Sequence, residues 1–233
     1  MAQLIERLDG DVVRANLARI EASAREAHMR SPGGRPEPRV LAAIKYLPDE
    51  QLPVLAQAGV KLVGENRAQQ LTAREAAYGP LFEWHFIGQL QSRKVAAIAP
   101  RTAMIHSLAS RSALTALEKV RESANPQLQL LIEVNVSGEP GKAGIEPGEL
   151  ASYLQAAPMP VVGLMTMPPL SADPAASRPY FAALRELADR HSLEHLSIGT
   201  SQDWRIAAEE GATIVRIGTS LFVPGDGDAH SSS

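Results

Sequence analysis

The chain has 233 residues, a net charge of −3, 45% hydrophobic residues and no cysteine. This composition excludes disulfides and cysteine-based metal or nucleophile sites, and the sequence contains no basic cluster of the kind that nucleic-acid binding requires. Aromatic residues make up only 4%, so the core must be aliphatic. No metal site is expected, and no apolar run approaches the ~18 residues of a membrane span. The start of the chain carries Glu6, Asp9 and Asp11 and is not a signal peptide, so we expect a cytoplasmic protein.

The first part of the chain has the spacing of a long helix. Apolar residues recur at helical intervals between Asp11 and Met29, which predicts a helix over that range. Residues 31–38 are rich in proline and glycine and predict a surface loop.

From residue 39 onward, short aliphatic runs alternate with longer amphipathic ones. Strands are expected over Val40–Ile44, Lys61–Val63, Trp84–Ile87, Met104–Leu108, Leu128–Val136, Val161–Met165, His195–Ile198 and Ile214–Ile217. Helices are expected over Asp49–Ala58, Arg67–Tyr78, Ser92–Ala99, Arg111–Ala124, Pro147–Ala156, Pro179–Arg190 and Gln202–Glu210. This alternation predicts a parallel sheet, and eight strands are the number that closes a barrel.

We therefore predict an α/β fold with one domain over residues 1–223, a (β/α)8 TIM barrel with an additional N-terminal helix. Residues 224–233 are small and polar and are expected to form a disordered tail. A doubly wound open sheet is the alternative. That fold usually has a glycine-rich turn after an early strand, whereas Lys45-Tyr-Leu-Pro48 follows the first strand here.

In a parallel barrel the active site lies at the carboxyl ends of the strands, and Lys45 directly follows the first strand. Burial of the lysine stem in the barrel mouth would lower the pKa of its amine and suit it to Schiff-base chemistry. Position alone favours a lysine that extends into solvent from a strand end.

The last third of the sequence predicts a phosphate site. Ser201 is expected to cap a helix that begins near Gln202, and Gly218-Thr219 follows the eighth strand. Barrel phosphate sites commonly use the loops after strands seven and eight, so this cradle would face the same cavity as Lys45. Arg216 lies two residues before Gly218 and would point into the mouth, where a structural ion pair with Glu133 is the alternative role.

A set of short motifs then resembles a known family. The motifs are Ala43-Ile-Lys45, Gly64-Glu-Asn66, Trp84-His-Phe-Ile-Gly88, Ile105-His-Ser107, Val134-Asn135, Lys142-Ala-Gly144, Gly163-Leu-Met165, Leu196-Ser-Ile-Gly-Thr-Ser201 and Val215-Arg-Ile-Gly-Thr219. In this order and spacing, from Val12 to Phe222, the chain resembles the pyridoxal 5′-phosphate (PLP) homeostasis proteins, the YggS/PROSC family.

The resemblance implies the fold of the alanine racemase N-terminal domain and PLP as the cofactor. It implies that Lys45 holds PLP as an internal aldimine and that Arg216 faces the pyridine nitrogen. The other implied cofactor-binding residues are Ser201, Gly218 and Thr219 around the phosphate, with Asn66, His85, Met165 and Ser197 near the cofactor. The chain departs from the family pattern at Ile44, Gln89, the Ile198-Gly-Thr200 segment and the end of the match, Phe222-Val-Pro-Gly225.

Arg216 also bears on whether the protein uses PLP or only holds it. PLP catalysis needs the pyridine as an electron sink, and an arginine cannot accept the pyridinium proton. We therefore expect a PLP-binding protein of intracellular vitamin B6 homeostasis without a strong catalytic activity of its own. Its expected partners are PLP and PLP-accepting apoenzymes, and a monomer is expected because the additional β-domain of the racemases has no counterpart in the sequence.

Two enzyme functions are alternatives. One is an amino-acid racemase of low activity, which needs a base on each side of the substrate. Tyr46 adjoins Lys45, but strand alternation would point the two side chains to opposite faces. The other is a Schiff-base aldolase that acts on a sugar phosphate.

Overall fold

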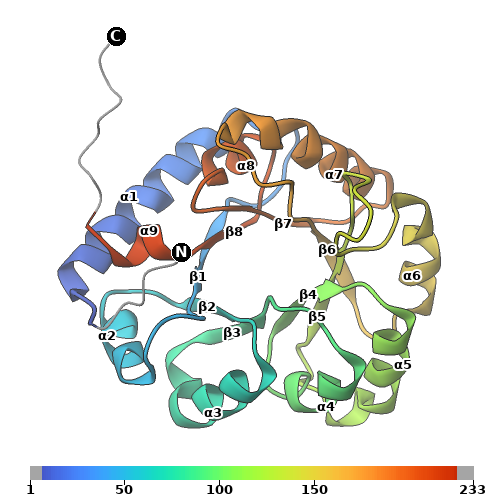
Figure 1. Cartoon of the computed structure of the whole chain (residues 1–233), viewed down its shortest axis with the longest axis horizontal. Coiled ribbons are helices and arrows are strands. Elements are labelled where there is room, and N and C mark those ends of the chain that lie inside the picture. Colours follow the sequence, from blue (N-terminus) through green and yellow to red (C-terminus); the bar gives the residue numbers. More distant parts are fainter. Residues whose placement is uncertain (1–6, 225–233) are drawn as a thin grey trace.

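A computed structural model describes residues 7–224, in which eight parallel strands close into a barrel (Figure 1). Each strand pairs with the next along the chain, and the last pairs with the first, so the barrel is confirmed and the open sheet is wrong. The strands are β1 (Arg39–Ala43), β2 (Leu62–Glu65), β3 (Glu83–Phe86), β4 (Met104–Leu108), β5 (Gln129–Glu133), β6 (Val161–Met165), β7 (His195–Thr200) and β8 (Ile214–Ile217).

Helices surround the barrel on its outside (Figure 1). They are α1 (Gly10–His28), α2 (Leu52–Gln57), α3 (Ala68–Tyr78), α4 (Val95–Ile98), α5 (Arg111–Lys119), α6 (Leu150–Ala156), α7 (Arg178–Arg190), α8 (Trp204–Glu209) and α9 (Thr219–Phe222). The additional helix α1 begins after Asp9, whose carboxylate accepts hydrogen bonds from the backbone N–H groups of Asp11 and Val12. It packs against α8 and α9, where the end of the described chain returns to the barrel.

The structure differs from the sequence prediction mainly at the helix ends. Four of the helices are preceded by a short 3₁₀ turn, at Asp49–Gln51, Ser92–Lys94, Pro147–Glu149 and Pro174–Ser177. Helix α8 begins two residues later than expected, and α9 was not expected. The predicted polar tail lies outside the described residues from residue 225 onward.

The barrel interior is apolar in one layer and polar in the next. Leu41, Leu62, Met104, Leu131, Met165 and Ile214 form a separate cluster in the barrel. Two residues further along their strands, His106 and Arg216 share the inward face of Met104 and Ile214. These polar side chains are buried, so each must find a hydrogen-bond partner within the barrel.

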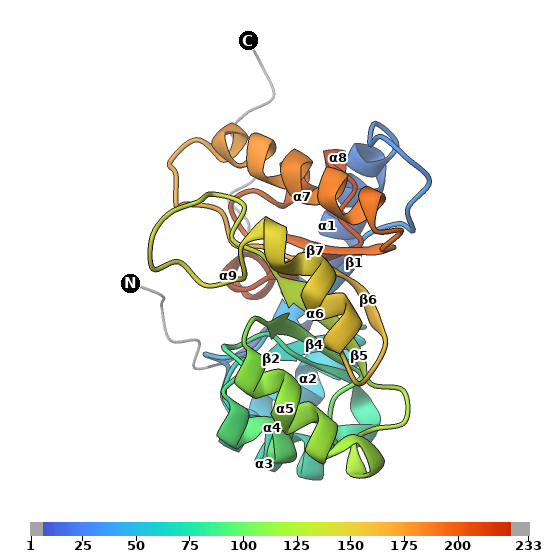
Figure 2. The ribbon, with the colours of Figure 1, turned by 90° about the vertical axis from the view of Figure 1, so that its right-hand side faces the viewer.

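The carboxyl ends of the strands meet at one end of the barrel. Seen from the side, the long loops that follow β5 and β6 project from this end (left in Figure 2). This arrangement brings together residues that are far apart in the sequence, and it determines where a ligand site can form.

Candidate functional site at the mouth of the barrel

A cavity of about 660 Å³ opens at the carboxyl ends of the strands. The predicted residues that line it are Lys45, Asn66, Met165, Ser201, Arg216, Gly218 and Thr219. His85 and Ser197, which were predicted to lie near the cofactor, are not among its lining residues. The cavity therefore unites the predicted lysine, the predicted phosphate cradle and Arg216 in one space.

Lys45 lies in a turn beyond β1 rather than on the strand. The strand ends at Ala43, and a hydrogen bond of 3.0 Å from Leu47 N–H to the Ile44 carbonyl closes the turn. The Lys45 side chain is exposed, so the expected burial of its stem is wrong, and its Nζ lies 4.8 Å from the centroid of the Tyr46 ring. Tyr46 lines the same cavity, because the turn removes the strand alternation that would have separated the two side chains.

Arg74 of α3 stabilises the turn that carries Lys45. The guanidinium donates to the carbonyl oxygens of Ile44 at 2.9 Å and Leu47 at 2.5 Å, and it forms an ion pair with Glu65 at 2.6 Å. The Arg74 side chain is only 3% exposed and that of Glu65 is fully buried. The sequence held no sign of this role, because Arg74 occupies an ordinary position in an amphipathic helix.

Arg216 enters the cavity from β8 with neutral partners on most sides. One terminal nitrogen donates to the backbone oxygen and to the hydroxyl of Ser197, both at 2.7 Å. The other donates to the Thr166 carbonyl at 3.0 Å and contacts the sulfur of Met167 at 2.8 Å. Among the described residues none accepts a hydrogen bond from Nε–H, so one donor of the guanidinium remains for a ligand.

The alternative ion pair between Arg216 and Glu133 does not form: no salt bridge joins them in the described part of the chain. Burial lowers the pKa of Arg216 to about 10, and the charges of Glu133 and Asp203 oppose this shift, so the guanidinium is a cation at neutral pH. Burial raises the pKa of the Glu133 carboxyl. A cation without a carboxylate partner therefore borders the cavity.

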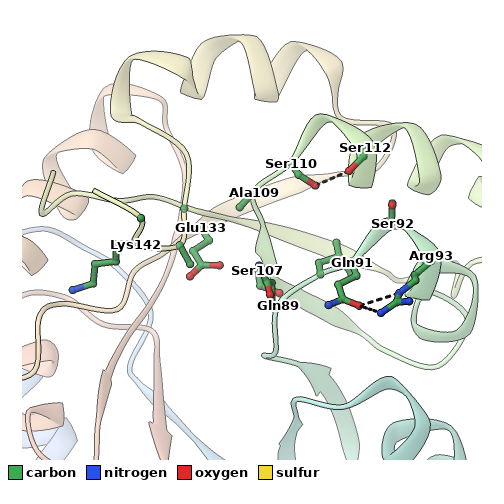
Figure 3. Close-up of a pocket in the computed structure, with 14 residues that line it drawn as sticks. Gln89, Gln91, Ser92, Arg93, Ser107, Ala109, Ser110, Ser112, Glu133 and Lys142 are labelled. Carbon is green, nitrogen blue, oxygen red and sulfur yellow. Dashed lines mark hydrogen bonds between the residues drawn. The ribbon is translucent and has the colours of Figure 1, made fainter. Parts of the chain in front are cut away.

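Glu133 also borders a second cavity of about 610 Å³ beside the first (Figure 3). In Figure 3 its carboxylate lies between Lys142 and Ser107, and the far wall carries Gln91, which accepts hydrogen bonds from Arg93, and the hydroxyl pair of Ser110 and Ser112. The Lys142 ammonium pairs with Glu139 at 3.0 Å. The cavity at the mouth is thus adjoined by a second cavity that is lined by polar side chains.

The predicted phosphate cradle forms, but its internal contacts differ from the expectation. The Ser201 hydroxyl does not cap α8; it accepts a hydrogen bond of 3.2 Å from Gly218 N–H and so ties the loops after β7 and β8 together. Asp203 precedes α8 instead, and its carboxylate accepts from Thr200 N–H at 2.7 Å and from the Ser177 hydroxyl at 2.7 Å. Within residues 7–224, no acceptor is found for the N–H groups of Ser201 and Gln202, which leaves them available to an anion.

Asn66, which follows β2, and Met165, which ends β6, also line the cavity. The side-chain oxygen of Asn66 is buried and has no hydrogen-bond partner among the described residues. A buried polar atom without a partner costs about 1–3 kcal/mol, so its presence in a cavity wall fits a missing polar ligand.

His85 and Ser197 lie deeper in the barrel than the sequence predicted. His85 lines a separate cavity of about 560 Å³ at the opposite end of the barrel, together with Glu83 and His195. Ser197 is fully buried beneath Arg216. Both residues reach the mouth only through other side chains.

Gly199 allows the chain to turn from β7 into the phosphate loop. Its φ is +87°, and a Cβ atom there would lie 2.5 Å from Ala207 Cβ and 2.9 Å from Trp204 Cα. Substitution of Gly199 by alanine should lower the free energy of unfolding by about 2–5 kcal/mol, because backbone strain and overpacking add. Gly33→Ala is the matched control, with φ +99° and no atom within 4 Å, and should cost about 1–2 kcal/mol in urea unfolding. Equal losses would show that the contact with α8 has no effect.

Comparison with known proteins adds a family to this geometry. Residues 12–225 match the family model described as alanine racemase, N-terminal domain. A pyridoxal phosphate homeostasis protein of Aquifex aeolicus is 41% identical over 217 residues, which cover 88% of this chain and 95% of that protein.

Solved structures agree with the fold. The structure of PipY from Synechococcus elongatus PCC7942, which was solved with PLP bound, has a TM-score of 0.72 and 31% identity, covering 86% of this chain and 99% of PipY. An alanine racemase from Corynebacterium glutamicum has a TM-score of 0.67 at 17% identity, covering 95% of this chain and 63% of the racemase, and shares the barrel fold.

Proposed function

Because the chain belongs to the family of pyridoxal phosphate homeostasis proteins, which share the alanine racemase N-terminal domain, we propose that it binds PLP in the mouth of the barrel. The observation that carries the proposal is the cavity itself. It places an exposed lysine, an arginine with a free Nε–H and a loop with unpaired N–H groups around one space of about 660 Å³.

The residues present fit the chemistry of PLP. The amine of Lys45 reaches the cavity and would hold the cofactor covalently, while Ser201, Gly218 and Thr219 would bind its phosphate. The phosphate would meet the hydroxyls and the N–H groups of the loops after β7 and β8. Asn66 and Met165, which line the same cavity, would also contact the cofactor.

Arg216 favours a carrier over an enzyme. When bound, PLP supplies an electron sink, which a carboxylate beside the ring nitrogen strengthens. Here the group that faces the cavity is a cation with a free Nε–H donor, so the ring nitrogen would accept a hydrogen bond and stay unprotonated. This electrostatic arrangement supports holding PLP for vitamin B6 homeostasis more than using it in catalysis.

The racemase alternative finds little support in the mouth. Racemisation needs a base on each side of the substrate, and the only tyrosine lining the described cavity is Tyr46. The Lys45 Nζ lies 4.8 Å above the Tyr46 ring, so both groups stand on the same wall. An aldolase that acts on sugar phosphates would also use a lysine, but it would bind no PLP.

Borohydride reduction tests the proposal. Protein supplied with PLP and then reduced should carry a pyridoxyl group on the peptide that contains Lys45, detected by mass mapping, because reduction fixes a Schiff base as a stable amine. The matched control is Lys142→Arg, which changes a lysine of the neighbouring cavity and should leave the adduct in place. A pyridoxyl group on Lys94 or Lys142 would overturn the role of Lys45, and an unmodified chain would overturn the cofactor.

The partners are part of the same proposal. PLP-accepting apoenzymes would receive the cofactor at an open mouth whose rim exposes Tyr46, Met167 and Leu170. A monomer in the cytoplasm is the proposed state. Within residues 7–224, no helix has the length and hydropathy needed to cross a membrane.

A further inference from the structure

A chain of hydrogen-bonded side chains runs through the barrel from its opposite end to Arg216. Glu83 accepts from His85 Nε2 at 2.9 Å, and His85 Nδ1 lies 2.9 Å from His106 Nε2. His106 Nδ1 lies 2.8 Å from the Ser197 hydroxyl, which accepts from Arg216 at 2.7 Å. His85, His106 and Ser197 are fully buried, so they have no access to water that could replace these bonds.

Each bond in this chain determines the direction of the next. A carboxylate only accepts, so His85 must present Nε2–H to Glu83, and in a neutral ring Nδ1 is then an acceptor. His106 must therefore donate from Nε2, which leaves its own Nδ1 as an acceptor for the Ser197 hydroxyl proton. The Ser197 oxygen is then left with lone pairs for Arg216, which only donates.

Both rings are held in the neutral state that this order requires. Burial lowers the pKa of His85 and lowers that of His106 well below its usual range. The titratable groups around these side chains are Glu83, Arg39 and His195 at the far end of the barrel and Arg216 at the mouth. Hydrogen bonds from His85 and Arg39 lower the pKa of Glu83 to about 2, so the terminal acceptor stays a carboxylate.

We propose that Glu83, His85, His106 and Ser197 form an oriented hydrogen-bond relay that positions the Arg216 guanidinium, with its Nε–H directed into the mouth. All four are positioning residues, because they lie outside the mouth cavity and act on it through Arg216. The inference rests on the proposed function in one respect, that the group Arg216 meets there is the ring nitrogen of PLP.

Glu83 is the best position at which to interrupt the relay. Its side chain is 39% exposed at the far end of the barrel, and replacing it changes no residue that lines the mouth cavity. In Glu83→Ala, His85 loses the acceptor that selects its tautomer. Long-range ¹H–¹⁵N spectra of the PLP-free wild type should show single Nε2–H tautomers for His85 and His106. The variant should show mixed tautomers at both rings and a shifted Arg216 Nε–H signal.

Glu83→Gln is the matched rescue. Glu83 Oε1 accepts from both His85 and Arg39, so the amide oxygen of glutamine should take that place and preserve the order. Glu37→Ala is the second control, because Glu37 lines the same far cavity but pairs with Arg25 at 3.0 Å. Both controls should keep the wild-type tautomers and the wild-type Arg216 signal.

The second measurement is an absorbance titration with PLP. Glu83→Ala should bind PLP about fivefold more weakly, the equivalent of one net hydrogen bond, while Glu83→Gln and Glu37→Ala should stay within about twofold of wild type.

Unchanged tautomers in Glu83→Ala, or Nδ1–H tautomers in the wild type, would overturn the relay. If the tautomers change in Glu83→Ala but the Arg216 signal and the PLP affinity do not, the relay does not position Arg216. If no variant binds PLP, the proposed function fails, whereas the tautomers and the Arg216 signal still decide the relay.

Discussion

Replacing Arg74 with methionine should lower the free energy of unfolding by about 3–5 kcal/mol, because it leaves the buried Glu65 carboxylate without its charged partner. The carbonyl oxygens of Ile44 and Leu47 lose their donor in the same step. Domains of this kind are stable by only about 5–15 kcal/mol, so this loss is a large share of the total. Urea unfolding followed by circular dichroism measures it.

Two further variants separate the causes. Asp49→Asn removes the exposed partner of Arg74 and should cost less than about 1 kcal/mol. The double variant Glu65→Gln/Arg74→Met removes both buried charges, keeps an acceptor for the N–H groups of Asn66 and Arg67, and should recover part of the loss. A double variant as unstable as Arg74→Met would show that the lost carbonyl contacts, and not the stranded charge, dominate.

Replacing Arg216 with glutamate should cost about 3–5 kcal/mol of stability and change the absorption spectrum of bound PLP. A carboxylate there would be buried beside the carbonyl oxygens of Ser197 and Thr166, which lose their donor. Where the variant binds PLP, the carboxylate favours a protonated ring nitrogen, whereas the guanidinium of the wild type disfavours it. Spectra of wild type and variant at equal PLP occupancy give the comparison.

Arg216→Gln is the matched control for this effect. It keeps N–H donors for the two carbonyl groups but carries no charge, so it should cost less stability and leave the ring nitrogen unprotonated. If the spectra of both variants equal that of the wild type, Arg216 does not face the ring nitrogen. If both change alike, the loss of the guanidinium matters and the added carboxylate does not.

Much of the fold could be predicted from local pattern. The strands β4, β6 and β8 have the predicted bounds, because aliphatic runs that are buried on both sides stand out against amphipathic helices. Helix ends were less predictable: the 3₁₀ turns before α2 and α4 and the start of α8 have no side-chain capping hydrogen bond, and Asp203 before α8 is instead held by the hydroxyl of Ser177. A contact of that kind joins residues 26 positions apart and leaves no local signal.

The sequence by itself determined the eight-strand alternation and which polar residues follow each strand, because both depend on period and order along the chain. It thereby identified Lys45, Arg216 and the Gly218-Thr219 pair as residues that would meet at the mouth. Only the tertiary structure decided that Lys45 is exposed beside Tyr46, that Ser201 bonds to Gly218, and that Arg74 holds the lysine turn. The relay from Glu83 to Arg216 is of the same kind. His106 and Ser197 are 91 residues apart and become partners only because barrel closure directs both side chains into one dry interior, where each polar atom must find another.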